Sequence, residues 1–229
     1  GEDKTKILFS QESWEGMHPN TLDLIAYDEA GKIGRMRVES IGGGDIRIPG
    51  ERTKANTEEK IVAITVDDCF QADNLQKIVD KAIEVGGKLT IFPIGKNTIQ
   101  KQQGEILKYA WENGFELENH TYTHNGLFAC SNEELAEEVY KQQLALSYIL
   151  GVNYQCHFLR PRGGDARDDQ RMQMYARQLG YYGIAHWSAS GSGSSMQSLP
   201  GKLEPGAIYL FHTTNDDLEK LVRFIPYAV

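Results

Sequence analysis

From residue 61 towards the C-terminus, short apolar runs alternate with segments of helical periodicity, and this alternation constrains the fold more than any other feature. The run 61–66 is almost continuously apolar, which is typical of a strand buried on both faces. Apolar residues then recur at helical spacing over 75–83, and Gly86-Gly87 ends that pattern. Strands that alternate with helices favour βαβ units, so we expect an α/β fold with a parallel sheet or barrel.

The same patterns predict the later elements of the chain. We expect strands at 89–92, 115–117, 182–187 and 207–211, and helices around 106–111, 131–151 and 172–179. Ser131 and Glu134 have the spacing of a capping box at the start of the longest of these helices. In α/β folds of this type, functional residues gather where the parallel strands end.

The first 59 residues have a different pattern, in which strand and turn signals replace the alternation of strands and helices. A short apolar run at 6–9 is a strand candidate, and the runs 22–27 and 33–38 flank a turn-forming segment, which is a hairpin signal. Residues 50–60 are polar and are typical of a linker. We therefore predict an N-terminal β-hairpin extension and linker over 1–59, followed by one α/β domain over 60–229.

The composition excludes two kinds of partner. The 229 residues carry a formal net charge of −8 without a Lys/Arg-rich run, so we expect no nucleic-acid partner. No apolar stretch reaches the roughly 18 to 20 residues that cross a bilayer, so we expect no transmembrane segment. The 3 cysteines are far apart in sequence and leave the cellular compartment open.

Side chains that can bind metals or transfer protons follow four of the predicted strand segments. Asp67 and Asp68 come directly after the run 61–66, and His120 and His124 follow the run 115–117. Two further residues stand in equivalent places on other segments: Arg160 after Phe158-Leu159, and His212 after 207–211. We therefore expect two carboxylates, one guanidinium and three imidazoles to meet at one face of the fold.

The spacing of His120 and His124 indicates a metal site. Two histidines four residues apart on a helical turn point to the same side, where both can bind one metal ion. A carboxylate from another strand would complete a set of two histidines and one acid, which leaves a coordination position for water and so suits catalysis. The neighbouring Asp67 and Asp68 allow one to bind the metal while the other acts as general base.

The order of these residues resembles the polysaccharide deacetylase family, also called the NodB-homology or carbohydrate esterase 4 family. The matching motifs are Thr65-Val66-Asp67-Asp68-Cys69, His120-Thr121-Tyr122-Thr123-His124, Arg160-Pro161-Arg162-Gly163-Gly164 and Leu210-Phe211-His212. The resemblance extends from about residue 60 to the C-terminus. It implies a distorted (β/α) barrel and a metal-dependent hydrolase that removes N-acetyl or O-acetyl groups from an amino-sugar polymer or oligomer.

The resemblance also implies a role for each residue that matches a motif. Asp68, His120 and His124 would bind one divalent ion, most often Zn²⁺, with Co²⁺ or Ni²⁺ as alternatives. Asp67 would be the general base, oriented by Arg160, and His212 would be the general acid. A backbone N–H near Gly163 would contact the oxyanion. The sequence leaves two roles open for Trp187, an aromatic surface that stacks on the substrate or a residue of the core. The partner implied is an acetylated glycan, and the family favours an extracytoplasmic location.

The chain departs from the family pattern in its fourth motif. An Asp that tunes the acid histidine usually follows Trp-Ser, but none follows Trp187-Ser188 here. Three residues elsewhere are candidate substitutes: Asp165, Asp168 and Asp216. This departure keeps two alternatives open, a hydrolase of another small or cyclic amide on the same fold, and a glycan-binding pseudoenzyme that holds a metal.

A second, weaker resemblance concerns about residues 17–48. Met17-His18-Pro19-Asn20-Thr21 and Ser40-Ile41-Gly42-Gly43-Gly44 are similar to a segment of the regulatory β-type domain of bacterial L-serine dehydratases. It implies a regulatory module that binds a small amino acid. The residues themselves equally fit a β-hairpin that packs on the barrel or pairs with another subunit to form a homo-oligomer.

Overall fold

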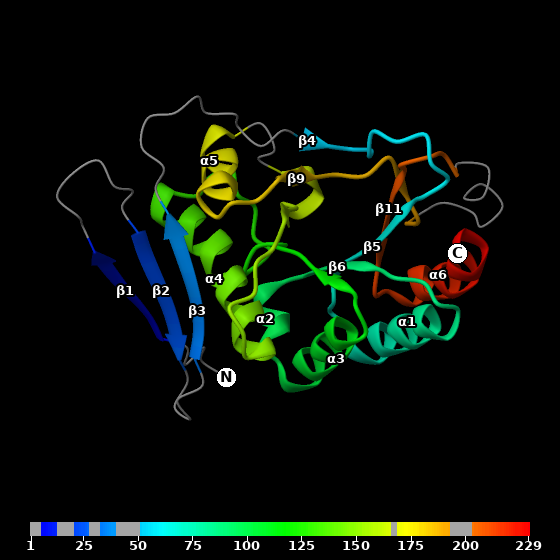
Figure 1. Ribbon diagram of the computed structural model, residues 1–229, viewed down its shortest axis with the longest axis horizontal. Coiled ribbons are helices and arrows are strands. Elements are labelled where there is room, and N and C mark those ends of the chain that lie inside the picture. Colours follow the sequence, from blue (N-terminus) through cyan, green and yellow to red (C-terminus); the bar gives the residue numbers. More distant parts are fainter. Residues whose placement is uncertain (1–5, 13–20, 28–32, 40–50, 166–168, 193–202) are drawn as a thin grey trace.

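A computed structural model describes residues 6–12, 21–27, 33–39, 51–165, 169–192 and 203–229 (Figure 1). Its central feature is a curved parallel sheet of five strands, in the order β10 (Ala189–Ser190), β11 (Ile208–His212), β5 (Ala63–Asp68), β6 (Thr90–Pro93) and β7 (Glu116–Leu117). A second parallel sheet has the order β8 (Phe158–Leu159), β9 (Gly183–Ala185) and β4 (Glu51–Arg52). A single parallel bridge between Asn119 and Leu159 joins the two sheets. Together they form the distorted (β/α) barrel that the sequence and its family resemblance predict.

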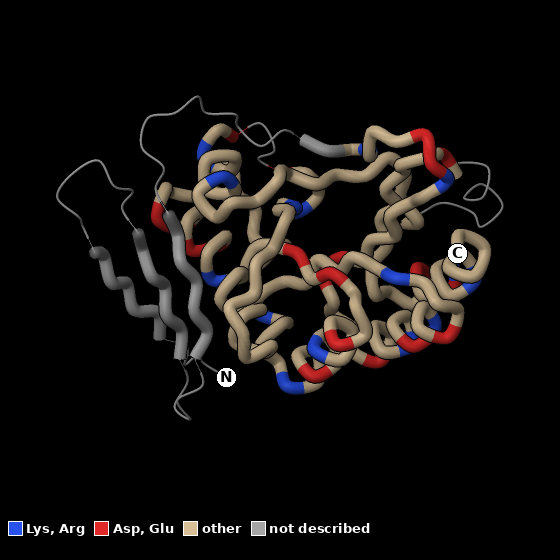
Figure 2. Tube along the Cα trace, in the orientation of Figure 1, with Lys and Arg blue, Asp and Glu red and all other residues tan. Residues whose placement is uncertain are grey.

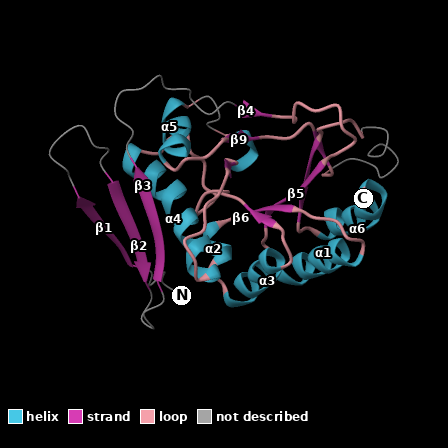
Figure 3. Ribbon diagram, viewed as in Figure 1, coloured by secondary structure: helices cyan, strands magenta, loops and turns pink. Residues whose placement is uncertain are grey.

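Helices cover the outside of this barrel (Figures 1 and 3). They are α1 (Ala72–Glu84), α2 (Gly95–Thr98), α3 (Lys101–Glu112), α4 (Asn132–Leu150), α5 (Gln170–Gln178) and α6 (Asn215–Ala228). On α1, Leu75, Ile78 and Val79 are fully buried, so the predicted apolar face packs on the sheet. Acidic and basic residues alternate along the outer helices α1 and α3 (Figure 2).

The longest helix begins and ends as its sequence indicates. The Ser131 side chain accepts from the Glu134 N–H, and the Glu134 carboxylate accepts from the Ser131 N–H, which confirms the capping box. At the other end Gly151 has a φ of 70°, a left-handed conformation that glycine adopts without steric cost. Among the described helices, none combines the length and apolarity that a membrane crossing requires.

The N-terminal segment forms a separate antiparallel sheet of β1 (Lys6–Glu12), β2 (Thr21–Tyr27) and β3 (Ile33–Glu39). The pairing of β2 with β3 confirms the predicted hairpin, and β1 pairs with the other edge of β2. Strand β3 lies beside α4 (Figure 1). Much of the segment 17–48 lies outside the described residues, so its resemblance to a regulatory domain stays a prediction, as does pairing with another subunit.

Part of the predicted linker is bonded to the barrel. Strand β4 pairs in parallel with β9, so it extends the second sheet by one strand. Beyond it, the Ala55 N–H donates to the Gly206 carbonyl at 2.8 Å, next to a bridge between Lys54 and Ala207. The proposed boundary between residues 59 and 60 therefore has barrel contacts on its N-terminal side, and the division into two domains stays a prediction.

A buried carboxyl group fills the seam between β7 and β8, where only one backbone bridge joins the strands. Glu118 is fully buried, and its Oε2 accepts from the N–H groups of His157 at 2.7 Å and Phe158 at 2.8 Å. Burial raises the pKa of Glu118 to about 8, against the opposing effect of these two backbone hydrogen bonds. The side chain therefore replaces backbone pairing that the two strands do not make.

We expect Glu118→Ala to lower the free energy of unfolding by about 2–4 kcal/mol, because two partly buried N–H groups lose their acceptor. Glu118→Gln keeps an acceptor oxygen of the same reach, so its loss should stay below about 1 kcal/mol. Urea unfolding at neutral pH measures both, with the exposed Glu112→Ala on α3 as the control. Equal losses for the Ala and Gln variants would contradict the role of Glu118 as an acceptor.

Candidate metal centre and proton-transfer site

The carboxyl ends of the strands bring the predicted site residues together. Strand β11 pairs with β5 in a register that sets His212 opposite Asp67, and β6 pairs with β5 so that Pro93 lies opposite Asp68. Asn119, which precedes His120, is bridged to Leu159, which precedes Arg160. The expected meeting of these four segments at one face of the fold is therefore observed.

Three side chains form a set that fits a divalent metal ion. The Asp68 Oδ1 lies 3.2 Å from the His120 Nε2 and 3.0 Å from the His124 Nε2. One candidate ligand atom from each residue lies within 4.8 Å of the others. Two ligands that are each about 2.1 Å from a tetrahedral ion stand about 3.4 Å apart, so this spacing suits one ion bound by all three.

The surroundings of His120 orient its ring for metal binding. Its Nδ1 lies 2.6 Å from the Arg160 carbonyl oxygen, which can only accept, so Nδ1 carries a proton and Nε2 is the nitrogen that faces Asp68 at 3.2 Å. Burial acts to raise the pKa of Asp68, but hydrogen bonds from His120 and His124 hold it well below its usual range. The carboxylate is therefore ionised and available as a ligand at neutral pH.

The segment from His120 to His124 is a loop and not the helical turn that the sequence analysis expected. Thr121 has a φ of 64° and His124 a φ of 63°, both in the left-handed region. Asp68 and Cys69 are also left-handed, with φ values of 69° and 62°. Ligands from both segments thus sit on backbone that non-glycine residues rarely adopt, which is common where a site is held by its surroundings.

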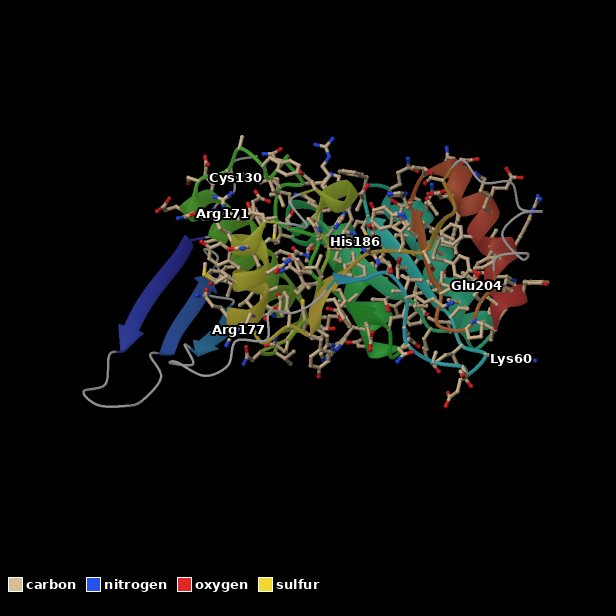
Figure 4. The ribbon with its side chains drawn as sticks, turned by 90° about the horizontal axis from the view of Figure 1, so that it is seen from above. Lys60, Cys130, Arg171, Arg177, His186 and Glu204 are labelled. Atoms are coloured by element: carbon tan, nitrogen blue, oxygen red, sulfur yellow. The ribbon has the colours of Figure 1, made fainter. Side chains whose placement is uncertain are left out.

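Arg160 holds Asp67 in place. Its side chain is fully buried, and its Nη1 donates to the Asp67 Oδ1 at 2.7 Å and to the Thr65 Oγ1 at 2.8 Å. Its other N–H groups donate to two backbone carbonyls, of Ala185 and His186, both at 3.1 Å. His186 lies centrally among the side chains in Figure 4. The orientation of Asp67 by Arg160, as the resemblance implies, fits this contact.

The second oxygen of Asp67 faces the metal ligands. Asp67 Oδ2 lies 3.7 Å from the His120 Nε2, beyond direct hydrogen-bond distance. The Arg160 guanidinium occupies Oδ1, so Oδ2 remains as the oxygen that can take a proton. A water molecule bound near Asp68 would lie within reach of this oxygen.

His212 has a carboxylate partner that the sequence analysis did not name. Its Nδ1 lies 3.0 Å from the Oδ2 of Asp217, which also accepts from the His212 N–H at 2.8 Å and the Ser192 hydroxyl at 3.0 Å. The hydrogen bond to Asp217 raises the pKa of His212, burial opposes it, and the charges of Asp67 and Asp68 add to the increase. His212 is therefore oriented and made more basic despite the altered fourth motif.

Two of the three candidate partners proposed from the sequence, Asp165 and Asp216, were wrong. Asp165 Oδ2 accepts from the Leu127 N–H, and Asp216 Oδ2 pairs with Lys220 at 2.6 Å. Asp168 lies outside the described residues. Asp217 was missed because it belongs to the first turn of α6, where its own N–H donates to the capping hydroxyl of Thr214. The Thr214-x-x-Asp217 spacing, read beside His212, is the signal that would have found it.

Three further residues, Gly163, Trp187 and Phe70, are candidates for substrate contact because each is at least partly exposed. Gly163 is exposed in the short 3-10 turn after Arg160, with a φ of 56°. Trp187 is half-buried, and its ring centroid lies 5.8 Å from the Arg160 guanidinium carbon. Phe70, which the sequence analysis passed over, is 57% exposed and meets the His124 ring edge-on at 6.0 Å between centroids. The roles of Gly163 and Trp187 towards a substrate stay predictions.

Comparison with known sequences identifies related proteins. A family model described as polysaccharide deacetylase matches residues 54–184. A peptidoglycan-N-acetylglucosamine deacetylase of Bacillus cereus is 26% identical over 177 residues, which cover 72% of this chain and 62% of that protein. Chitin deacetylase 2 of Cryptococcus neoformans is 32% identical over 128 residues, which cover 53% of this chain and 27% of that protein. The chain thus spans less than two thirds of the length of these curated relatives.

Comparison with solved structures shows the same fold. A CE4 family pseudoenzyme from Bacillus anthracis has a TM-score of 0.69 at 18% identity, covering 96% of this chain and 83% of that one. A family 4 carbohydrate esterase from Streptomyces lividans, solved in complex with acetate, has a TM-score of 0.62 at 19% identity. That alignment covers 73% of this chain and 86% of the esterase.

We expect Asp217→Asn to lower the pKa of His212, because the imidazolium loses the carboxylate that stabilises its positive charge. The protonated form should therefore be lost at a lower pH than in the wild type. An NMR titration of the histidine ring signals in metal-free protein measures this shift. Asp216→Asn, on the exposed side of the same helical turn, is the matched control and should leave the His212 titration unchanged.

Proposed function

The chain belongs to the polysaccharide deacetylase family, and from that membership we propose that it is a metal-dependent deacetylase of an amino-sugar polysaccharide or oligosaccharide. The reaction proposed is hydrolysis of N-acetyl groups, with O-acetyl groups as a second class of substrate. The observation that carries the proposal is the meeting of the Asp68-His120-His124 set with two proton carriers, Asp67 and His212, at adjacent strand ends. Relatives named as peptidoglycan and chitin deacetylases support a glycan as substrate.

The metal site fits Zn²⁺, with Co²⁺ or Ni²⁺ as alternatives, because two imidazoles and one carboxylate suit each of these ions. When bound, such an ion lowers the pKa of a water molecule and polarises the acetyl carbonyl. The chain's own contribution begins with Asp67, whose Oδ2 takes the proton from the attacking water. Arg160 keeps that carboxylate fixed, so little reorganisation is needed during the reaction.

His212 is proposed to protonate the departing amine. An amine leaves readily only after its nitrogen gains a proton, and a positioned acid of this kind contributes roughly 10²–10⁴ in rate. The Asp217 carboxylate accepts a hydrogen bond from Nδ1 of His212, so Nε2 is the ring nitrogen that would donate a proton to the leaving amine. The raised pKa of His212 keeps a larger fraction of it protonated near neutral pH.

The remaining residues are proposed to contact the substrate. A backbone N–H at Gly163 would donate to the oxyanion that forms on the acetyl group. Trp187 would offer a half-buried aromatic surface to a sugar ring, and Phe70 would offer a second one beside His124. Aromatic faces of this kind pack against the apolar faces of pyranose rings, which supports a glycan over a very small acyl donor.

Asp217 also separates this proposal from its main alternative. A CE4 family pseudoenzyme shares the fold, and the altered fourth motif of this chain could indicate the same loss of activity. The His212–Asp217 contact restores the acid–carboxylate pair from another segment, so this chain keeps each proton carrier that the reaction needs. Hydrolysis of another small or cyclic amide uses the same groups, and the substrate test below distinguishes it.

The proposal is tested by acetate release from chitooligosaccharides, peptidoglycan fragments and a cyclic imide, before and after treatment with a chelator. We expect release from an acetylated glycan, loss of that activity with the chelator, and recovery on addition of Zn²⁺. Hydrolysis of the imide alone would replace the glycan proposal with the amide alternative. Binding of glycan without turnover, at full metal occupancy, would identify a pseudoenzyme.

We expect Asp67→Asn to keep the metal and lower kcat by about 10²–10⁴, because the general base is lost while Asp68, His120 and His124 remain. His124→Ala should lose the metal, as elemental analysis of the purified variants will show. The exposed Asp73→Asn at the start of α1 is the control. Asp67 neutralises a buried guanidinium, so its substitution can also destabilise the fold, and urea unfolding of the variant must accompany the assay. Full activity in a folded Asp67→Asn protein would refute the assignment of Asp67 as the general base.

A further inference from the structure

The loop between the two histidine ligands needs an external support. Thr121 and His124 both have left-handed backbone, which is unfavourable for non-glycine residues and persists only where the surroundings enforce it. The loop forms no helix or strand of its own. The spacing of the two imidazoles therefore depends on what holds residues 121–123.

Backbone groups at the start of α2 hold one side of the loop. The Gly95 N–H donates to the Thr121 carbonyl at 3.0 Å, and the Lys96 N–H donates to the Tyr122 carbonyl at 2.9 Å. A Cβ on Gly95 would lie 2.2 Å from the Tyr122 ring, so the loop packs closely against this turn. These contacts satisfy the carbonyl groups of Thr121 and Tyr122 but leave the loop's N–H groups to find acceptors elsewhere.

A single carboxylate from α4 holds the other side. Glu138 Oε2 accepts from the N–H groups of Tyr122 at 3.0 Å and Thr123 at 2.9 Å. Glu138 Oε1 accepts from the Thr123 hydroxyl at 2.5 Å. Glu138 is 8% exposed, so these three contacts are shielded from water and from competing donors.

The same turn of α4 also secures the strand end before the loop. The carbonyl of Val139, the residue after Glu138, accepts from the Asn119 side chain at 2.8 Å. The Asn119 Oδ1 in turn accepts from the Thr121 N–H at 2.9 Å. Helix α4 therefore contacts the chain both immediately before His120 and between His120 and His124.

We propose that Glu138 is a positioning residue of the metal centre, which sets the separation of His120 and His124 and thereby the affinity for the metal. Within the described part of the chain, its hydrogen bonds go to Tyr122 and Thr123 and not to a metal-ligand side chain or a proposed proton carrier. It acts through the backbone of Tyr122 and Thr123, because a carboxylate that binds two adjacent N–H groups fixes both peptide planes. This inference rests on the proposed metal site and extends it to a residue outside the ligand set.

The chemistry of the side chain predicts a graded effect. Glu138→Gln keeps the length and one acceptor oxygen for the two N–H groups, but it loses the negative charge that strengthens these bonds. Glu138→Ala leaves two N–H groups and a hydroxyl without this acceptor, so the loop can relax. Substitution of residues that orient metal ligands typically costs about 10- to 100-fold in affinity.

The test measures the Zn²⁺ dissociation constant of metal-free protein by competition with a chromophoric chelator. We expect Glu138→Ala to raise it by about 10- to 100-fold and Glu138→Gln by about tenfold or less. Glu137→Gln is the matched control, because Glu137 is the neighbouring, exposed acid of the same helix and pairs at the surface with Lys141. That control should leave the dissociation constant within twofold of the wild type.

A purely structural role would lower stability without changing metal affinity in the folded fraction. Urea unfolding of the metal-free variants therefore accompanies the titration, and Glu138→Gln remains the measurement if Glu138→Ala fails to fold. An affinity unchanged within twofold in folded Glu138 variants would overturn the proposal. If the wild type binds Zn²⁺ tightly but has no deacetylase activity, the proposed reaction is refuted and the proposed role of Glu138 is not. If the wild type binds no metal, both the proposed reaction and the role of Glu138 are refuted.

Discussion

The buried contact between Arg160 and Asp67 is the interaction on which the rest of the site depends. The Arg160 guanidinium is removed from water, and a buried charge is tolerated only when it is paired and fully hydrogen-bonded. Asp67, Thr65 and two carbonyls near β9 supply those partners, and the Phe92 ring lies 4.0 Å from the guanidinium carbon. The Arg160 carbonyl meanwhile fixes the tautomer of His120. One residue thus joins the proposed base to the proposed metal centre.

Much of this arrangement could be predicted from sequence, because the site residues come directly after strands that the sequence reveals. A buried strand such as 61–66 is visible as an apolar run, and parallel pairing then brings the residues after each run to one face. The capping box of α4 was predictable for a similar reason, since it depends on two residues three positions apart. Local patterns of this kind need no knowledge of the tertiary structure.

Contacts between distant segments were not predictable in the same way. Strand β4 has only two residues, too few for any periodic pattern, and its pairing with β9 exists only in the folded chain. The spacing of His120 and His124 fits a helical turn, but contacts from α2 hold the loop in another conformation. The left-handed backbone of Cys69, with a φ of 62°, was likewise not indicated by any local pattern, because cysteine rarely adopts that region. The partner of His212 was missed because several aspartates are near in sequence and only packing selects Asp217.

The two acid–base pairs of the site differ in how tightly they are tied to the fold, and this difference has a consequence for the evolution of such chains. Asp67 neutralises a guanidinium that is wholly buried, whereas His212 is 28% exposed, and its buried partner Asp217 also accepts from the Ser192 hydroxyl and the His212 N–H. Loss of the His212 imidazole should therefore destabilise the fold less than loss of Asp67, which would leave a buried guanidinium without its counter-charge. An intact Asp67 is for this reason weak evidence that a descendant is still an enzyme, and the His212 pair is the better marker of retained activity.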